Sequence, residues 1–224
     1  MPDNHVIVTI KERHSCRDFT DKIVTPEQIH QILDASKHTP SSTNMQPWEV
    51  VVVTGEAKKK LDSALLDAFD TQVPPNHEMS AYLEKWEEPF KSRRFECGVG
   101  LYEALGIGRK DKETRLAQTR KNFNAFGAPA VLIFYMDRIL QEGSLFDMGL
   151  FLQTVMLSAQ SLGLATCAEA SLVAYSNIVK EMFKIPKEKR LIIGLALGYR
   201  DTKSPVNTYR TKREPVEKFT RFFS

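Results

Sequence analysis

The stretch LFDMGLFLQTVMLSAQSL, residues 145–162, decides the fold because its apolar side chains occur on every side of a helix. A helix at the surface of a domain carries apolar residues along one stripe, whereas a helix that is apolar all round is buried. Gly163 follows directly and ends it. The sequence therefore predicts a long helix that is buried on every side, in the core or in a subunit interface.

Strand-like runs lie on both sides of this helix in the sequence. They are EVVVVT (49–54), AVLIFYM (130–136) and LIIGLAL (191–197). Helical patterns occur at about 25–38, 56–69 and 175–183, and the first begins with a capping box in which Thr25 is the N-cap and Gln28 the third helical residue. Strands separated by long helices are typical of an α/β or α+β layered domain.

We expect one such domain over residues 1–224. The part at about 70–124 is the least regular and contains Pro74, Pro75 and Pro89 and the charge run RKDKETR. We interpret this region as a solvated helical excursion from the domain or as a mobile cap over a pocket, and the two interpretations are compatible.

Composition limits the possible partners. The chain is 42% hydrophobic and 26% charged, which is ordinary for a soluble protein. No apolar run approaches the roughly 20 residues of a membrane-spanning helix, and the N-terminus lacks the pattern of a signal peptide. We therefore expect a cytoplasmic protein without a membrane partner. The 31 Lys and Arg are interleaved with 28 acidic residues, which argues against nucleic-acid binding.

Common catalytic and metal-binding motifs are absent from the sequence. It has no GxGxxG after a strand, no GxxxxGK[ST], no HExxH and no GxSxG. The three cysteines, Cys16, Cys97 and Cys167, form no CxxC pair, and the five histidines show no ligand spacing, so no disulfide or metal site is expected. Cys16 and Cys167 have no neighbouring base, so we interpret them as small hydrophobic residues rather than nucleophiles.

The loop HTPSSTNMQPW, residues 38–48, carries more hydrogen-bonding side chains than a connection between a helix and a strand needs. Two arginine pairs add positive charge: Arg13 and Arg17, which would share one face if that segment were helical, and Arg210 and Arg213 near the end of the chain. Arginine binds phosphate oxygens through two parallel hydrogen bonds. Each arginine pair alone fits a solvated surface, but together with the loop they favour a bound phosphorylated ligand.

Five segments resemble the FMN-dependent nitroreductases and their flavin-reductase and dehalogenase relatives. They are ERHSCRDF, TPSSTNMQPW, FGAPAVLIF, SLGLATCAE and RTKREPV, in the family's order and over nearly the whole chain. The resemblance implies an α+β fold in which helices wrap a central, mostly antiparallel sheet. It also implies an intertwined homodimer with two FMN sites at its interface, and it makes the helix at 145–162 the central dimer helix.

The resemblance further implies which residues hold FMN. The arginine segments would bind the phosphate and ribityl end, the loop at 40–44 would reach into the partner subunit's site, and the backbone at Ala168 would approach flavin N5, the atom that accepts hydride. The complete set implied for the cofactor is Arg13, His14, Ser15, Arg17, Pro40, Ser41, Ser42, Asn44, Asn122, Ala168, Glu169, Arg210 and Arg213. Phe123, Phe126 and the region of Phe95 are candidates for a substrate wall, with core packing as the alternative.

The activity implied is NADH- or NADPH-dependent reduction of nitroaromatics, quinones or flavins by ping-pong two-electron transfer, in which the flavin, rather than a protein side chain, is the catalytic group. Two alternatives stay open at this point. One is another FMN-dependent reaction of the same fold, such as reductive dehalogenation or flavin breakdown, and the other is a protein that binds FMN without being an enzyme.

Overall fold

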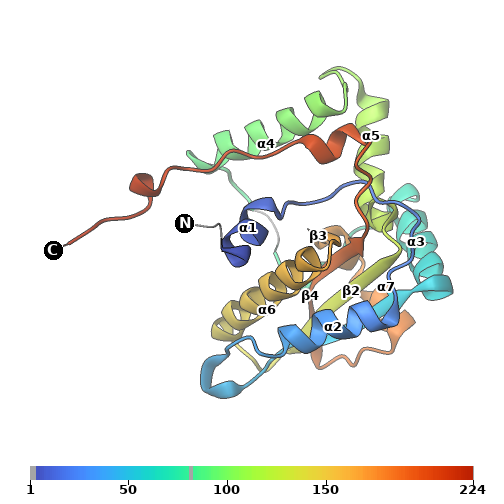
Figure 1. The fold of residues 1–224 in the computed structure, drawn as a ribbon. Helices are drawn as coiled ribbons and strands as arrows, with labels where there is room; N and C mark the ends of the chain where they lie inside the picture. Colours follow the sequence, from blue (N-terminus) through green and yellow to red (C-terminus); the bar gives the residue numbers. More distant parts are fainter. Residues whose placement is uncertain (1–3, 81–82, 224) are drawn as a thin grey trace.

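The structure, a computed structural model, describes residues 4–80 and 83–223. Within these residues, four antiparallel strands form one sheet in the order β1-β2-β4-β3 (Figure 1). The strands are β1 (Glu49–Thr54), β2 (Ala130–Asp137), β3 (Ala165–Glu169) and β4 (Lys189–Gly198). The three predicted strands and the α+β class are confirmed, whereas β3 was not predicted as a strand.

The helices surround this sheet. They are α1 (His5–Glu12), α2 (Pro26–Ser36), α3 (Gly55–Asp70), α4 (Phe90–Ala104), α5 (Lys112–Arg120), α6 (Glu142–Ser161) and α7 (Ser176–Phe183). The predicted capping box is present, because the Thr25 side chain accepts from the Gln28 backbone and the Gln28 side chain accepts from the Thr25 backbone. The excursion at 70–124 contains α4 and α5, and its role as a cap over a pocket stays a prediction.

Strand β2 is buried on both faces, and this gives the fold its layers. Leu132 and Phe134 belong to a core cluster shared with α2 and α6, while Val131 and Ile133 point to the opposite face and belong to a cluster shared with α3 and α7. Successive side chains of a strand alternate between faces, so a continuous apolar run is what a covered sheet needs. The result is three layers, with helices on both sides of the sheet (Figure 1).

Helix α6 is buried on one side within this chain. Met148, Phe151, Val155 and Ala159 form one buried stripe against the sheet. Phe146, in contrast, is 71% exposed in the single chain, so burial of the helix on its other sides, in a subunit interface, stays a prediction. Burial within one chain therefore accounts for only part of the helix's apolar surface.

Helix α4 runs beside the C-terminal segment (Figure 1). Gly100 of α4 lies against the Tyr209 ring, where a Cβ atom would collide with it, and the Tyr209 hydroxyl reaches the Glu96 carbonyl oxygen at 3.4 Å. A glycine at this position thus permits the close packing of the segment on the helix. Among the described residues, no helix is both long enough and apolar enough to cross a membrane.

Candidate functional site

The segment after α1 places the first arginines at the edge of the sheet. Helix α1 ends at Glu12, and Arg13 already has extended backbone angles (φ −60°, ψ 126°). Ser15 then forms a parallel bridge with Thr166 of β3, and the Cys16 N–H donates to the Thr166 carbonyl at 3.0 Å. The helical arrangement considered for Arg13 and Arg17 is therefore wrong, since these residues flank a short strand-like pairing.

Asn207 connects this segment to the C-terminal one. Its side-chain oxygen accepts from the Arg17 N–H at 2.9 Å, and its Nδ2 donates to the carbonyl oxygens of Asp18 at 2.7 Å and Asp201 at 2.9 Å. The side chain is buried, so these bonds are shielded from water. Because Asn207 is tied to the Arg17 backbone, Arg210 and Arg213 are brought toward Arg17 despite their separation in sequence.

Cationic side chains gather where the two segments meet. We call Arg13, Arg17, Arg200, Arg210 and Arg213 the arginine cluster. Arg200 was not singled out from the sequence; it lies two residues after the end of β4, and its Nη1 lies 3.3 Å from His14 Nε2. Only the position at a strand end, where functional residues often lie, offered a signal for Arg200.

Burial and the positive charges of the arginine cluster lower the pKa values of basic groups within and beside it. Burial lowers the pKa of His14, and the positive charges of Arg210, Arg200 and Arg13 lower it further against an opposing backbone hydrogen bond. Burial and the charge of Arg213 lower the pKa of Arg13, and burial and Arg200 do the same for Arg210. These cations therefore repel one another in a partly desolvated position.

No member of the arginine cluster forms an ion pair with a carboxylate in the described part of the chain. Their recorded bonds go mainly to carbonyl oxygens, as from Arg17 Nη1 to Ser15 (3.4 Å) and from Arg210 Nη1 to Asn207 (2.8 Å). Arg13, Arg17 and Arg200 are half-buried, whereas Arg210 and Arg213 are exposed. Half-buried like charges without counter-charges favour an anion beside them. The donor set fits a phosphate group.

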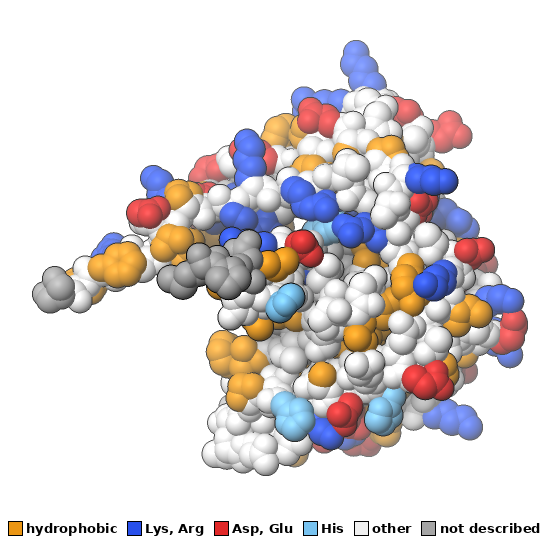
Figure 2. Space-filling model, viewed as in Figure 1, with side chains coloured by type: hydrophobic (Ala, Val, Ile, Leu, Met, Phe, Trp, Pro, Cys, Tyr) orange, Lys and Arg blue, Asp and Glu red, His pale blue; other side chains and the backbone are white. Residues whose placement is uncertain are grey.

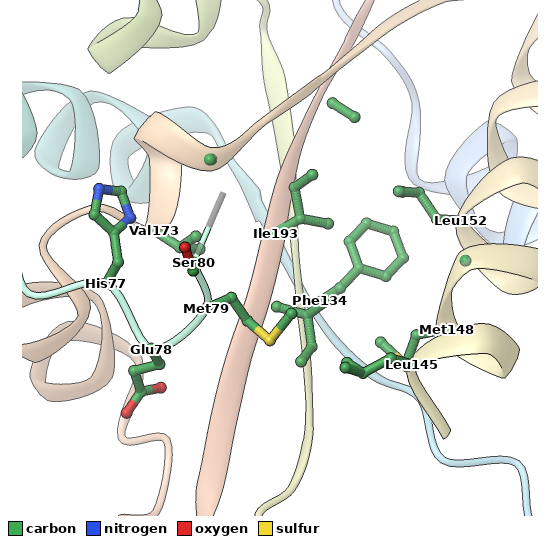
Figure 3. A pocket seen from close by; sticks show the side chains of 14 residues that line it. His77, Glu78, Met79, Ser80, Phe134, Leu145, Met148, Leu152, Val173 and Ile193 are labelled. Carbon is green, nitrogen blue, oxygen red and sulfur yellow. The ribbon is translucent and has the colours of Figure 1, made fainter. Parts of the chain in front are cut away.

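An apolar cavity of about 420 Å³ lies on the α6 side of the sheet (Figure 3). Phe134 and Ile193 of the sheet, together with Met148 and Leu152 of α6, form its apolar wall, opposite the segment that carries Met79. Ala168 and Ala170, at the end of β3, also line it. A mostly apolar lining with a few polar side chains is typical of cofactor and small-molecule sites.

Glu169 points to the opposite face of the sheet from Ala168. Its carboxyl group is buried, and neither oxygen has a hydrogen-bond partner among the described residues. Burial raises the pKa of Glu169 well above its ordinary value, although the charges of Arg17 and Lys58 act in the other direction. Lys58 is itself buried and pairs with Asp62 at 2.6 Å. Burial thus favours the protonated form of this carboxyl group, which lies within reach of the Arg17 charge.

The loop at 40–44 lies elsewhere. It is held by the Ser42 N–H, which donates to both Asp147 oxygens at 3.3 Å, and by the Gln46 N–H, which donates to Ser41 Oγ at 2.9 Å. Thr43, Asn44 and Gln46 have positive φ angles, and their side chains are exposed. In Figure 1 the loop is at the lower left, far from where α1 meets the C-terminal segment.

One chain therefore does not bring all the predicted cofactor residues together. Arg13, His14, Ser15, Arg17, Arg210 and Arg213 gather at one place, and Ala168 and Glu169 lie on the adjoining strand. Pro40, Ser41, Ser42 and Asn44 are remote from them in the same chain (Figure 1).

The segment at 121–127 places the remaining candidates. Asn122 is half-buried and donates to the Thr119 carbonyl at 2.8 Å, whereas the side-chain oxygen of Asn124 is buried without a partner among the described residues. An unsatisfied buried amide oxygen makes Asn124 a further candidate for contact with a ligand. Asn124 was missed from the sequence, where it differs little from Asn122.

The three phenylalanines proposed for a substrate wall differ in burial. Phe123 stacks on Phe69 with ring centroids 4.5 Å apart, and both Phe123 and Phe126 are buried in the core. This is where the alternative of core packing would place them, and their contact with a substrate stays a prediction. Phe95 of α4, in contrast, is 60% exposed.

Cys16 and Cys167 are buried thiols. Burial raises the pKa of Cys16 to about 11 and that of Cys167 to about 12. Both thiols are therefore protonated at neutral pH, and neither is poised as a nucleophile. Within residues 4–80 and 83–223 there is no group of three or more His, Cys, Asp or Glu residues that could hold a metal ion.

Comparisons with known proteins agree on one family. The model of the nitroreductase family matches residues 10–199. A 4-nitrobenzoate reductase of Nocardioides sp. is 35% identical over 216 residues, which cover 95% of this chain and 87% of that protein. A nitrobenzene nitroreductase of Ectopseudomonas oleovorans is 33% identical over 216 residues, 95% of this chain and 94% of its own length.

A solved structure shows the same arrangement of elements. The FMN-dependent nitroreductase NfnB of Mycobacterium smegmatis, crystallised in complex with NADPH, superposes with a TM-score of 0.93 at 29% identity. The superposition covers 98% of both chains. The similarity therefore extends over the entire fold, including α4 and α5.

Proposed function

The chain belongs to the nitroreductase family, and from this premise we propose that it is an FMN-dependent oxidoreductase that uses NADH or NADPH to reduce nitroaromatic compounds. The observation that carries this proposal is the arginine cluster, which has no carboxylate partners in the described chain and lies near the end of β3. Relatives of this chain are named for the reduction of 4-nitrobenzoate and nitrobenzene, which supports nitroaromatic acceptors.

In this proposal Arg13, Arg17, Arg200 and Arg210 hold the FMN phosphate, and Asn207 fixes their relative position through its bonds to the backbone. The flat ring system would lie against the end of β3, where Ala168 and Ala170 line the apolar cavity. Bound FMN would supply the chemistry, by accepting hydride from the nicotinamide and passing it to the acceptor in a ping-pong cycle.

Protein side chains have three tasks in this scheme. The arginines neutralise the phosphate charge, the apolar wall excludes water from the ring, and burial disfavours a negative charge on Glu169 that would repel the phosphate. Asn124 offers an unpartnered amide oxygen to a donor on the ligand. None of these side chains needs to act as a nucleophile.

A homodimer completes the site in this proposal. The loop at 40–44 presents exposed serine and asparagine side chains far from the arginine cluster of its own chain, so a second copy would bring its loop to that cluster. Large apolar side chains are also exposed, and those of the projecting C-terminal arm (residues 214–223) are seen in Figure 2. Phe219, Phe222 and Phe223 are 71%, 84% and 92% exposed, and Phe146 of α6 is 71% exposed. A partner subunit would cover them.

Two half-reactions test the proposal. The purified protein should show a flavin absorbance spectrum, which bleaches when NADPH or NADH is added without oxygen and recovers when 4-nitrobenzoate or nitrobenzene is added. A protein that binds FMN but is not reduced by either nucleotide would be a non-enzymatic FMN-binding protein. A colourless protein that FMN cannot reconstitute would contradict the cofactor assignment itself.

A further inference from the structure

A second basic site lies outside the arginine cluster. A groove of about 1060 Å³ lies between α4 and the segment that leads into α5. We call it the cap groove; the residues that matter for its chemistry are the aromatic side chains Trp86, Phe95 and Tyr102 and the basic side chains Arg94, Arg109 and Arg115. Its volume is at the upper end of ordinary small-molecule sites, which span roughly 300–1,000 Å³.

Aromatic rings hold two of its arginines in place. The Arg94 guanidinium lies 4.7 Å from the centre of the Trp86 ring, and that of Arg115 lies 4.2 Å from the centre of the Tyr102 ring. Stacking fixes the plane of a guanidinium group and leaves its N–H edges free to bind an anion. Arg115 is half-buried, which strengthens its interaction with any anion in the groove.

The arginines of the groove differ from the two arginines nearest to them in sequence that do not line it. Arg93 pairs with Glu214 at 3.1 Å, and Arg120 pairs with Asp70 at 2.7 Å. Arg94, Arg109 and Arg115 have no ion pair in residues 4–80 and 83–223. The groove arginines therefore keep a positive charge that no carboxylate of the described chain neutralises.

Two carboxylates also line the groove, together with Lys91. Glu88 is engaged by Ser92, whose hydroxyl donates to it at 2.5 Å, and Glu103 is exposed. Four basic side chains against two acidic ones leave the lining with an excess of positive charge. An anionic ligand with an aromatic part fits this combination of charge and rings.

The cap groove adjoins the arginine cluster through α4. A second groove, of about 960 Å³, is lined by Arg210 and Arg213 and shares Phe95, Val99 and Glu103 with the cap groove. Helix α4 has 15 residues and is therefore about 22 Å long. A ligand in the cap groove would thus lie beside the proposed FMN site without occupying it.

We propose that the cap groove binds the adenosine 2′-phosphate part of NADPH, and that Arg109 and Arg115 thereby make the protein select NADPH over NADH. This inference rests on the proposed function. NADPH and NADH differ only in the 2′-phosphate, a dianion that suits two neighbouring arginines. Arg115 Nη1 donates to the Arg109 carbonyl at 3.5 Å, so the two residues lie side by side. The adenine ring would pack against the aromatic and apolar wall at Phe95 and Tyr102.

Steady-state kinetics on the FMN-loaded protein test the selection. The substitutions Arg109→Ala and Arg115→Ala should each lower kcat/KM for NADPH by about ten- to hundredfold and leave kcat/KM for NADH within about twofold. Lys110→Ala is the matched control, because Lys110 is exposed, adjacent to Arg109 and not part of the groove lining. It should leave both values within about twofold of wild type.

Binding of the adenosine fragments separates the groove from the redox chemistry. By calorimetry, wild-type protein should bind adenosine 2′,5′-bisphosphate more tightly than adenosine 5′-phosphate, and Arg115→Ala should remove the difference. Arg115→Lys retains the charge without the planar stack and should give an intermediate difference. Thermal melting of each variant shows whether it is folded.

Three results would overturn the inference. One is equal binding of the two adenosine phosphates by wild-type protein. Another is an unchanged ratio of NADPH to NADH efficiency in both arginine variants while the protein reduces nitroaromatics, a result that leaves the proposed function intact. The third is a higher KM for 4-nitrobenzoate but not for nitrobenzene, with NADPH unaffected, which would assign the groove to an acceptor carboxylate. Failure of both nucleotides to reduce the flavin would instead contradict the proposed function, and the calorimetry would still decide on the groove.

Discussion

The arginine cluster and the surroundings of Glu78 differ in whether their basic side chains are paired with a carboxylate. Glu78 accepts hydrogen bonds from Lys180 Nζ at 2.7 Å, from the Leu191 N–H at 2.7 Å and from the guanidinium of Arg138. Its side chain is 11% exposed and that of Lys180 is 12% exposed, so the charges are paired out of contact with most of the solvent. In the arginine cluster, cations meet without any such carboxylate.

This difference separates charges that hold the fold from charges that await a ligand. The contacts of Glu78 connect its segment, residues 77–80, to α7 and β4. Removing the carboxylate would leave the Lys180 cation without its ion-pair partner in a position mostly shielded from solvent. Removing one arginine of the cluster would instead relieve repulsion in the protein without ligand. The two regions should therefore respond oppositely to the loss of one charged side chain.

Substitution at Glu78 should have the largest effect. We expect Glu78→Ala to lower the free energy of unfolding by about 3 kcal/mol or more, because Lys180 loses its partner in a buried position. Denaturant unfolding measures this value. Glu56→Ala is the control, since the Glu56–Lys59 pair is exposed, and it should change the free energy of unfolding much less than Glu78→Ala does. An equal fall in the free energy of unfolding for Glu78→Ala and Glu56→Ala would contradict the view that the buried Glu78 contacts hold the fold.

Substitution at Arg17 should affect the ligand rather than the fold. We expect Arg17→Ala to weaken FMN binding by about ten- to hundredfold, because one charge-assisted contact to phosphate is lost. Without FMN, its melting temperature should equal or exceed that of the wild type, since like charges are separated. Fluorescence titration with FMN and thermal melting provide the two values, and a large fall in the melting temperature without FMN would make Arg17 a structural residue.

Glu169 predicts a pH dependence of smaller size. In the unfolded chain its carboxyl group ionises around its ordinary pKa of 4.5, whereas burial keeps the folded group protonated to higher pH. Stability from this group is therefore complete below that value and is lost as pH rises toward the raised pKa of the folded state. Glu169→Gln should melt at a higher temperature than wild type at pH 8, and the difference should shrink at pH 4. A difference that is constant with pH would show that Glu169 is ionised in the folded protein.

The smallest effect is expected at Arg120. Its guanidinium binds both Asp70 oxygens, but the two side chains are each 44% exposed. We expect Arg120→Ala to lower the free energy of unfolding only slightly, and far less than Glu78→Ala does, with FMN affinity unchanged. Unfolding in the presence and absence of FMN checks both statements. A loss as large as that of Glu78→Ala would show that geometry, rather than burial, sets the strength of these pairs.

Local sequence signals were sufficient for most of the fold. The runs that became β1, β2 and β4 are β-branched and apolar, and Thr25 and Gln28 define the start of α2 without any tertiary contact. Strand β3, in contrast, has the sequence ATCAE, whose alanines have little preference for strands, and it exists because it pairs with β4. Its pairing with Ser15 also explains why Arg13 and Arg17 are not on one helix.

The sequence predicted individual residues of the candidate site but not how they come together in space. Arginines near both ends of the chain indicated a phosphate site, but their meeting depends on Asn207, whose bonds link residues about 190 positions apart. Arg200 and Asn124 became candidates only through their neighbours in space. The helix at 145–162 was predicted to be buried all round, and one chain leaves Phe146 exposed, because a sequence pattern does not say which chain covers an apolar face.

The affinity of the protein for FMN compared with riboflavin tests the central claim most directly, because the two ligands differ only in the phosphate. We predict that wild-type protein binds FMN at least about a hundredfold more tightly than riboflavin. Arg17→Ala and Arg210→Ala should each reduce this ratio about ten- to hundredfold while leaving riboflavin affinity nearly unchanged. Equal affinity for the two ligands in the wild type, or a ratio that neither substitution changes, would contradict the assignment of the arginine cluster to the phosphate.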